Sequence, residues 1–399
     1  MSQNEHPETS AGLSNRLIFL FAVTAGASVG NLYWSQPLLA YMAQSFGVAT
    51  HDAGMVVTLT QVGYALGVFS LVPLGDMLPR QKLIPAVLIL SAAALVASAV
   101  APNLPLLLAA SLFLGFATVA GQIVTPLTGD LASDAQRGKA LGLVVSGLVF
   151  GILVIRAVSG ILADFLGWRT VFVIGAVIMV VLALLMGKAL PVLPPKLKLS
   201  YGGLLKSMLQ LPFTDKRIPR TLLLGALPMG TFMLFWTGMT LLLSGEPFHY
   251  SAGQIGTIGL LSITGAAASL GVGRLHDKGL SRPATLVGIF LMLIPLALSA
   301  IWYQSVWPVA LVIIVFSAGI QVLLVLIQTR MLSLNPMARS RLNTLFVVSN
   351  FIAGSLGSAI AALSWNWDGW QGLAIIGSGL MVATLIAWVV DARATDRGH

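Results

Sequence analysis

The order of apolar and polar residues divides the chain into twelve long apolar runs separated by short polar segments. Each run approaches the ~20 residues that an α-helix needs to cross a bilayer core of about 30 Å. The runs lack the alternation of a β-strand, and a backbone in lipid must bond within a helix or a closed barrel. The pattern predicts an all-α membrane protein with twelve transmembrane helices, at approximately 17–40, 52–74, 83–101, 104–129, 140–163, 170–190, 219–245, 252–273, 283–302, 306–332, 342–364 and 370–390.

Landmarks in the first half of the chain return about 200 residues later. The charged turn 75–82 is echoed by 273–282, and Gly167-Trp168 by Gly369-Trp370. A period near half the length indicates two homologous bundles, because a solenoid would repeat every few tens of residues. We therefore expect two pseudo-symmetric six-helix bundles, with the following division: tail 1–16, N-terminal bundle 17–190, central loop 191–218, C-terminal bundle 219–390 and tail 391–399.

Composition agrees with a lipid environment. Of the 399 residues 57% are hydrophobic and 9% charged, and the mean hydropathy is +0.92, whereas soluble domains carry roughly a quarter charged residues. The bilayer is therefore the expected surroundings of most of the surface. The chain has no cysteine, which excludes disulfides, thiol nucleophiles and cysteine metal sites.

The net charge of +9 indicates how the chain is oriented in the membrane. All of the 22 Lys and Arg residues except Arg156 and Arg169 lie in the tails, in the even-numbered loops or at the span ends beside them. This positive-inside pattern places both termini and the central loop in the cytoplasm, for a protein of the cell inner membrane. Anionic lipid is the expected counter-charge, and no nucleic-acid partner is expected. The first apolar run is too long for a signal peptide, so we expect no cleavage.

Polar side chains within the spans of the first half are candidates for lining a binding cavity. In span 1 they form a polar-aromatic cluster, for which an aromatic belt at the membrane interface is the alternative. In span 2 two of them lie three residues apart on one helix face, where a plain interhelical hydrogen bond is the alternative. The candidates are Asn31, Trp34, Gln36, Gln61, Tyr64 and Gln122.

Arg156 is the most informative single residue, because it lies about 10 Å inside the outer boundary of span 5. A charge there costs at least about 2.5–3.5 kcal/mol and marks a functional site or a paired structural charge. Its helical neighbours Ser159, Gly160 and Ala163 are small, which places it on a packing or cavity face. The interpretations are contact with a substrate or a gating partner, pairing with carbonyl groups, or snorkelling to the outer face.

Twelve spans in two halves, a long basic central loop and a charged turn between spans 2 and 3 resemble the major facilitator superfamily, with its drug and sugar efflux-like members. The resemblance covers essentially the whole chain. It implies a cytoplasmic charge network that holds helices together in the outward-facing state; a merely solvated loop is the alternative. The turn departs from the family pattern at Val72, Met77 and Pro79. The residues carried over to the network are Asp76, Arg80, Lys82, Asp130, Arg137, Asp277, Lys278 and Arg282.

The same resemblance extends in part to span 5. The family's antiporter motif ends in Gly-Pro-x-x-Gly-Gly, where this chain has 155–160 with Arg156 at the proline position. The family's substrate cavity lies at midplane between the halves, which rock around it. In the second half we expect Trp236, Gln321 and Asn350 to line it, with packing or interhelical hydrogen bonds as the alternative.

The sequence lacks the residues that ATP hydrolysis, metal binding and recognition of cationic drugs require. No Walker sequence is present, and all five histidines lie outside the span centres, so we expect no ATP hydrolysis, metal site, cofactor or enzymatic reaction. The span centres also lack carboxylates, which are the usual partners of cationic drugs. With Arg156 this favours a neutral or anionic substrate. The central loop is expected to hold an amphipathic helix within 200–211.

The expected function is secondary active transport of a small organic molecule by alternating access, as efflux with protons as the coupling ion. Efflux and proton coupling are implied by the resemblance alone. Uptake by the same fold is the alternative within the class. A membrane enzyme would need clustered His or carboxylate residues at one face, and a sensor would need a soluble domain; we find neither in the sequence.

Overall fold

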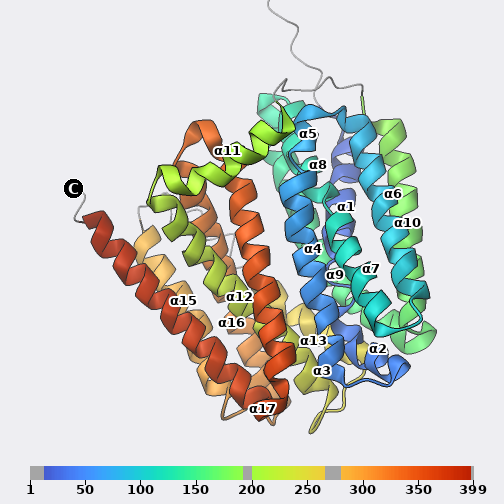
Figure 1. Ribbon diagram of the computed structural model, residues 1–399, viewed down its shortest axis with the longest axis vertical. Helices are drawn as coiled ribbons and strands as arrows, with labels where there is room; N and C mark the ends of the chain where they lie inside the picture. The colour runs from blue at the N-terminus through green and yellow to red at the C-terminus, as the bar shows by residue number, and fades with distance from the viewer. Residues whose placement is uncertain (1–12, 192–199, 266–279, 397–399) are drawn as a thin grey trace, which may run out of the picture.

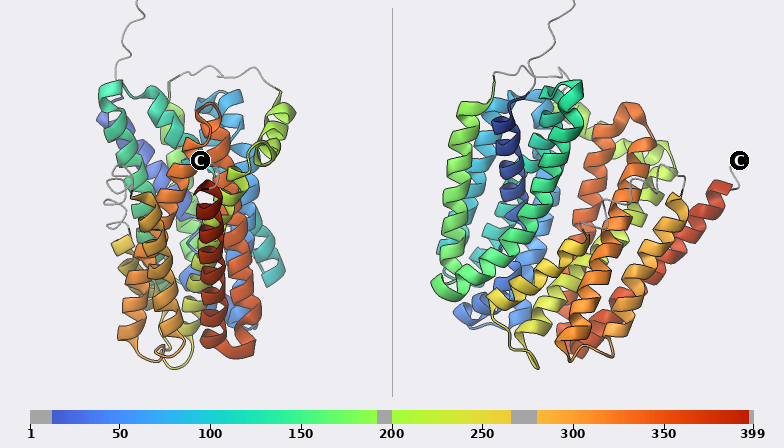
Figure 2. Two further views of the ribbon diagram at one scale, coloured as in Figure 1. Left: turned by 90° about the vertical axis from the view of Figure 1, so that its left-hand side faces the viewer. Right: turned by 180° about the vertical axis from the view of Figure 1, so that it is seen from behind.

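The computed structural model describes residues 13–191, 200–265 and 280–396 (Figure 1). Within these ranges all regular secondary structure is helical. The helices form two bundles side by side, the first built from the N-terminal half of the chain and the second from the C-terminal half (Figures 1 and 2). Each bundle has its own core of buried apolar side chains. The protein therefore has the pseudo-symmetric architecture of twelve transmembrane helices expected from the repeat.

The first bundle contains seven long helices, because its fourth span is divided in two. Short helical turns lie at both ends of the long ones. The long helices are α1 (Asn15–Gly30), α4 (Met55–Leu71), α6 (Arg80–Val100), α7 (Leu104–Ala117), α8 (Ala120–Leu131), α9 (Asp134–Leu166) and α10 (Trp168–Ala189), and the short ones are η1 (Gln36–Leu38), α2 (Leu39–Phe46), α3 (Thr50–Ala53) and α5 (Leu74–Met77).

The second bundle follows an intervening helix, α11 (Tyr201–Thr214). Its last helix is continuous in hydrogen bonding but turns sharply at Asp368 and Gly369, so it makes two spans. Gly369 has φ 51° and ψ −132°, a conformation that favours glycine. The helices are α12 (Arg217–Ser244), α13 (Ala252–Gly259), η2 (Leu260–Ser262), α15 (Ser281–Ser299), α16 (Val306–Ser333), η3 (Pro336–Ala338) and α17 (Arg339–Asp396).

Nine segments of the described chain are long and apolar enough to cross a membrane, and α17 accounts for two of the expected spans. Span 8 begins as α13, and its continuation lies partly outside the described residues. Spans 1 and 4 differ from the continuous helices that we predicted. Span 1 leaves the α-helix after Gly30, and span 4 breaks at Thr118 and Val119 between α7 and α8.

The break in span 4 is stabilised from a neighbouring helix. The hydroxyl of Ser91 on α6 lies 3.0 Å from the carbonyl oxygen of Ala117 and 2.9 Å from that of Val87 in its own helix, and the N–H of Val119 also donates to Ala117, at 2.9 Å. A carbonyl released from the helical ladder costs free energy in the membrane unless it finds another donor. Continuous apolar runs carry no signal for such a break, because the compensating donor lies in another helix.

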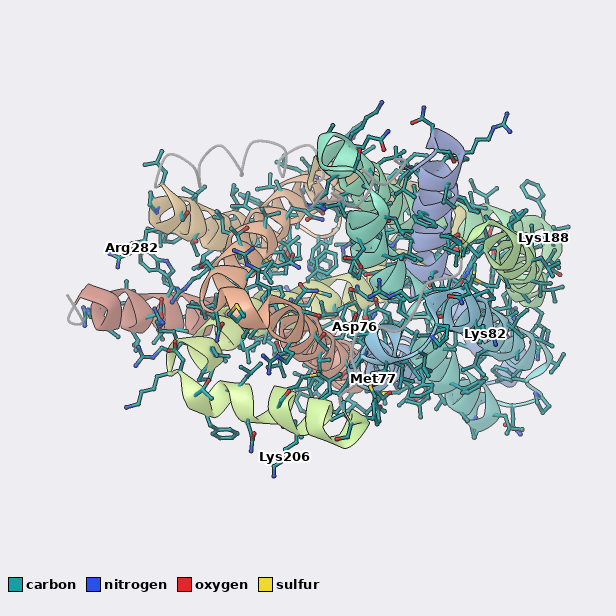
Figure 3. All side chains as sticks on the ribbon, turned by 90° about the horizontal axis from the view of Figure 1, so that it is seen from above. Asp76, Met77, Lys82, Lys188, Lys206 and Arg282 are labelled. Atoms are coloured by element: carbon teal, nitrogen blue, oxygen red, sulfur yellow. The ribbon has the colours of Figure 1, made fainter. Side chains whose placement is uncertain are left out.

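The two ends of the molecule differ in charge. The basic end bears Lys82, Lys188, Lys206 and Arg282 on the face seen in Figure 3, together with the start of α1 and the helix α11. The opposite end carries the connections 47–49, 101–103, 245–251 and 300–305.

Candidate functional site

Arg156 lies on α9 in the contact between the two bundles. Its side chain is 4% exposed. The guanidinium carbon is 4.2 Å from the ring centroid of Trp236, on α12 of the second bundle, and 5.2 Å from that of Tyr33, in the turn after α1. A guanidinium over an aromatic face gains cation–π attraction, which is strongest where water is excluded. One charged side chain thus joins aromatic rings from both bundles.

The hydrogen-bonding groups around Arg156 are incompletely used. Its Nε and Nη2 atoms are buried and have no acceptor, and Trp236 Nε1 and Ser317 Oγ are likewise buried without a partner in the described protein. A buried donor left unpaired costs about 1–3 kcal/mol, and more when it is charged. This group of donors is therefore destabilising unless an acceptor comes from outside the described chain.

A cavity of about 80 Å³ adjoins Arg156 between the bundles. Its walls come from α9 of the first bundle and from α12, η2 and α16 of the second. Most of the wall is apolar, with two hydroxyl groups and one amide. The lining residues are Val149, Ile152, Leu153, Arg156, Phe232, Ser262, Ser317, Ile320 and Gln321.

Glycines on α13 allow α9 to approach closely. A Cβ atom on Gly256 would lie 2.6 Å from the carbonyl oxygen of Arg156, and one on Gly259 would lie 2.9 Å from its Cδ. Gly160 makes the reciprocal contact with the backbone at Ala252. Small residues let helices pack at short distance in lipid. The sequence therefore brings the second bundle against the arginine itself.

The predicted cluster in span 1 is divided by the structure. Trp34 Nε1 donates to Asn31 Oδ1 at 2.8 Å, and the Asn31 amide contacts Met179 Sδ at 3.2 Å. This pair is buried within the first bundle. Gln36 instead faces the second bundle, where its amide nitrogen lies 4.0 Å from Met233 Sδ. Neither arrangement reaches the cavity beside Arg156.

Tyr64 and Gln122 form a second polar contact. Gln122 Nε2 donates to Tyr64 Oη at 3.0 Å, and the Tyr64 ring lies 4.4 Å from that of Phe351 on α17. The nearby Gln61 is fully buried, and neither its Oε1 nor its Nε2 has a partner in the described protein. Tyr64 thus joins Gln122 of its own bundle to α17 of the second bundle.

Of the second-half candidates, Trp236 and Gln321 meet Arg156, the first through its ring and the second through the cavity wall. Asn350 on α17 lies beside Gly225 of α12 and is absent from that wall. Tyr33 belongs to the polar-aromatic cluster predicted in span 1, whereas Phe232, Ser262 and Ser317 were not predicted from the sequence. Ser317 carried a usable signal, since it precedes Gln321 by four residues and so shares its helix face.

The charged turn after α4 forms a compact cluster at the basic end. The Arg80 side chain is 7% exposed and is fully paired: Nη2 donates to Asp76 and Nη1 to Asp130, each at 2.7 Å. Its Nε donates to the carbonyl oxygen of Gly75 at 2.6 Å. Arg137 donates to the carbonyl oxygen of Gly129 at 3.0 Å.

The remaining predicted network residues are Lys82, Asp277, Lys278 and Arg282. Lys82 is exposed and has no ion pair among those described. Asp277 and Lys278 lie outside the described residues. Arg282 lies at the start of α15 and lines a cavity with Arg217, Arg330 and Asp391. Arg330 Nη2 donates to Asp391 Oδ1 at 2.8 Å, a pair that we did not predict because Asp391 fell in the expected tail.

At the opposite end, polar contacts bridge the bundles. Asp164, near the end of α9, accepts from Tyr41 Oη and Ser251 Oγ at 2.7 Å each, and from the backbone N–H of Gly253 at 3.0 Å. Ser251 and Gly253 belong to the start of α13, where the positive end of the helix dipole favours an anion. Thr58 Oγ1 also donates to Ser358 Oγ of α17 at 3.2 Å.

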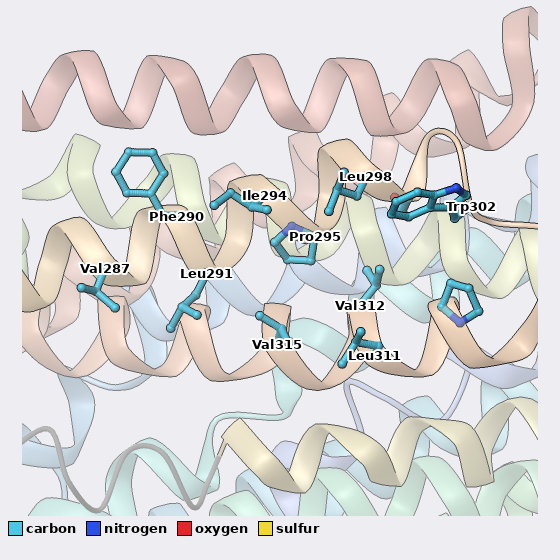
Figure 4. A pocket seen from close by; sticks show the side chains of 12 residues that line it. Val287, Phe290, Leu291, Ile294, Pro295, Leu298, Trp302, Leu311, Val312 and Val315 are labelled. Atoms are coloured by element: carbon cyan, nitrogen blue, oxygen red, sulfur yellow. The ribbon is translucent and has the colours of Figure 1, made fainter.

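A larger cavity of about 420 Å³ lies between α15 and α16, away from these polar groups (Figure 4). Its labelled side chains are apolar, among them Phe290, Ile294 and Trp302. Several of them are widely exposed on the bundle surface, as expected of a surface that faces lipid. It offers little to orient a polar molecule. Among the described residues no group of three His, Asp or Glu side chains could hold a metal ion.

Comparisons with known proteins agree with this architecture. The family model described as Major Facilitator Superfamily matches residues 18–338. The chain is 37% identical to the "Uncharacterized transporter YgaY" of Escherichia coli O157:H7 over 94% of this chain and 95% of that protein. It is 26% identical to a "Probable sugar efflux transporter" of Helicobacter pylori (strain G27), over 92% and 93%.

Among solved structures, that of the POT family transporter PepTSo superposes with a TM-score of 0.76 at 12% identity, covering 97% of this chain and 99% of that one. At this identity the likeness concerns the fold alone. Family model, relatives and fold agree on a multi-pass membrane transporter of small molecules, and the chain belongs to the Major Facilitator Superfamily.

Proposed function

We propose that this transporter exports a small organic molecule, neutral or anionic, across the cell inner membrane in exchange for protons. The observation that carries the proposal is Arg156, a buried charge between two aromatic rings that belong to different bundles. Such a residue senses both the substrate and the relative position of the bundles. The name of the Helicobacter pylori relative supports the direction of transport.

The orientation follows from the distribution of basic residues. We place the basic end and both termini in the cytoplasm, with the bundles spanning 17–190 and 219–390. The helix α11 then lies on the cytoplasmic side, where Tyr201 Oη donates to the carbonyl oxygen of Ser70 at 2.8 Å. A cavity of about 490 Å³ opens there between the turn that follows α4, the helix α11 and the start of α17. In this orientation the structure corresponds to an inward-facing state.

Alternating access requires the contacts at the opposite end to break and the basic end to close. The bridges from Asp164 to α13 and from Thr58 to Ser358 belong to the inward-facing state. Asp76 lines the cytoplasmic cavity and pairs with Arg80, which also binds Asp130. This cluster stabilises the bundle that must rotate as a body. We assign no chemical reaction to the protein, and protons enter the proposal only as the coupling ion.

Everted membrane vesicles test export and coupling together. Respiration acidifies their interior, and a pH dye reports the gradient. A proton-coupled exporter should dissipate the gradient when a transported sugar or small carboxylate is added, relative to vesicles without the protein. Dissipation only in right-side-out vesicles, with an inward substrate gradient, would overturn export in favour of uptake.

Alternating access is tested in the same vesicles by disulfide locks, since the native chain has no cysteine. Thr58→Cys with Ser358→Cys joins the two bundles at the opposite end, where the native oxygens are 3.2 Å apart. Thr237→Cys with Ser358→Cys is the matched control, because that 3.0 Å pair lies within the second bundle. Oxidation should stop transport only in the first variant, and a reductant should restore it. Unchanged transport in a fully cross-linked first variant would contradict alternating access.

A further inference from the structure

We propose that the Arg156 site takes an organic monoanion, held through its carboxylate by the Nε and Nη2 atoms of the guanidinium. This inference rests on the proposed function and narrows it to a substrate class.

The same edge of an arginine is occupied elsewhere in this molecule. In Arg217, Nε and Nη2 both donate to Asp215 Oδ2, at 2.9 and 2.7 Å. In Arg80 they donate to the Gly75 carbonyl and to Asp76. In Arg156 neither atom has an acceptor among the described residues. This edge forms a planar fork that matches the two oxygens of a carboxylate, with short charge-assisted hydrogen bonds.

The charge count around the cavity favours a single negative charge. Of the described residues that line it, Arg156 alone is charged. One carboxylate would balance this guanidinium, whereas a phosphate dianion would bring a second negative charge with no partner. A neutral sugar would leave the guanidinium buried without a counter-charge, which is costly in a dry site.

The cavity walls indicate the chemistry of the rest of the ligand, beyond its carboxylate. Ile152, Leu153, Phe232 and Ile320 provide apolar surface. Ser317 Oγ is unpartnered, so it is available to one hydroxyl or carbonyl of the ligand. With about 80 Å³ of space in this conformation, a compact body is expected: a short aliphatic, hydroxylated or aromatic acid.

The aromatic contacts connect binding to movement. Tyr33 moves with the first bundle and Trp236 with the second, and both rings lie against the guanidinium. The Nε and Nη2 atoms are buried in this arrangement. Separation of the bundles would uncover the fork, and a carboxylate bound there would take over the stabilisation that the rings provide. The ligand therefore has different affinities for the two states, as a driven conformational change requires.

Thermal unfolding of the detergent-purified full chain tests the proposal with matched probes. Lactate and benzoate are each compared with their isosteric amides, lactamide and benzamide, and glucose serves as a neutral sugar. Binding to the folded state raises the unfolding temperature in a concentration-dependent way. We expect both acids to raise it and the amides and glucose to leave it unchanged.

Three variants test whether the acid-induced shift in unfolding temperature depends on Arg156. Arg156→Gln should require at least a tenfold higher acid concentration for the same shift, and Arg156→Lys should be intermediate, since it keeps the charge and loses the fork. Arg169→Gln is the control. Arg169 also lies 4.2 Å from a tryptophan ring, that of Trp168, but it donates to the carbonyl oxygen of Ala101 and lies outside the cavity. The Arg169→Gln variant should show the same acid-induced shift in unfolding temperature as wild type.

Equal shifts from acid and amide, a larger shift from glucose, an unaltered response in Arg156→Gln, or no shift from either acid would each overturn the monoanion assignment. The unfolding temperatures of the ligand-free variants show whether each one is folded. The disulfide locks respond to whichever compound is transported. A neutral substrate stopped by the Thr58–Ser358 lock would therefore remove this inference and leave the transporter proposal standing.

Discussion

Arg80 and Arg156 are buried to nearly the same degree, with 6% and 4% of the residue exposed, yet their surroundings are opposite. Arg80 uses Nε, Nη1 and Nη2 to reach two carboxylates and a carbonyl oxygen of its own bundle. Arg156 has aromatic faces from both bundles, while its Nε and Nη2 atoms have no acceptor in the described protein. The fold supplies hydrogen-bond acceptors for Nε and Nη2 of Arg80, and the described protein supplies none for the same atoms of Arg156.

The difference separates a charge that stabilises structure from one that is available to a ligand. Removing one partner of a buried ion pair is strongly destabilising because the remaining charge is left alone. A buried charge without a hydrogen-bond acceptor already carries that cost in the folded protein. Its retention at the contact between two moving bodies is therefore best explained by a ligand that supplies the acceptor.

The largest expected effect comes from Arg156→Gln on transport. Loss of a charge-assisted interaction of about 2–3 kcal/mol corresponds to a fall of roughly 30–140-fold in gradient dissipation at low substrate concentration. The unfolding temperature should stay the same or rise slightly, because the variant removes an unsatisfied charge. Arg169→Gln should transport like wild type. A folded Arg156→Gln protein with normal transport would remove Arg156 from the site.

Arg80→Gln, in contrast to Arg156→Gln, should lower the stability of the protein. It leaves Asp76 and Asp130 without their cation, at a cost on the order of 2–3 kcal/mol because both carboxylates are partly solvated. The apparent unfolding temperature should fall by several degrees. Lys82→Gln, two residues away, exposed and without a described ion pair, is the control and should unfold like wild type. An equal loss in both variants would show that the Arg80 contacts contribute nothing specific.

Asp164→Asn should shift the balance between conformations by a smaller amount. The amide keeps one acceptor oxygen but loses the charge that faces the start of α13, which weakens the bridge by about 1 kcal/mol and changes the population about fivefold. The measurement is maleimide labelling of a single Thr58→Cys, which should be faster in the Asp164→Asn background. A cysteine at Ser207, in the basic-end cavity, should be labelled more slowly. Parallel changes at both ends would contradict the exchange of access.

The smallest effect belongs to Asp215, whose partner Arg217 is widely exposed. Hydrogen bonds from Arg217 hold the pKa of Asp215 below its usual value. A lowered folded-state pKa stabilises the protein above the unfolded-state pKa of about 4, and this contribution is lost as the pH falls through the lowered value. Asp215→Asn should therefore unfold slightly earlier than wild type at neutral pH, with the gap closing below about pH 4. A gap that widens in acid would contradict this assignment.

The sequence predicted the twelve spans and two bundles because membrane thickness and a backbone without water constrain helices severely. It predicted Arg156 for the same reason, since a full charge inside an apolar run is rare. The break after Gly30 escaped prediction because the polar and aromatic residues that follow were interpreted as lining a cavity or as an interfacial belt within one continuous span. The break after Ala117 escaped it because its run stays mostly apolar. Ser91, whose hydroxyl reaches the carbonyl oxygen at the second break, lies on another helix.

The partners of Arg156 were harder to infer than the residue itself. Trp236 and Gln321 were selected as isolated polar or aromatic residues, but their meeting with Arg156 depends on how the second bundle packs against α9. Asn31 and Trp34 looked equally suitable and instead bond to each other inside the first bundle. Composition identifies which side chains are unusual in a membrane; only the packing of the bundles decides which of them share one cavity.

Giving Arg156 a carboxylate from the protein tests most directly whether this arginine is available to a ligand. Ser317→Asp places an acid in the wall of its cavity, and Ser317→Asn is the matched neutral control. If the substrate normally supplies the acceptor, Ser317→Asp should raise the ligand-free unfolding temperature above that of Ser317→Asn and abolish both the acid-induced shift and transport. A Ser317→Asp protein that is folded and still binds and transports the acids like the Asn variant would contradict the account.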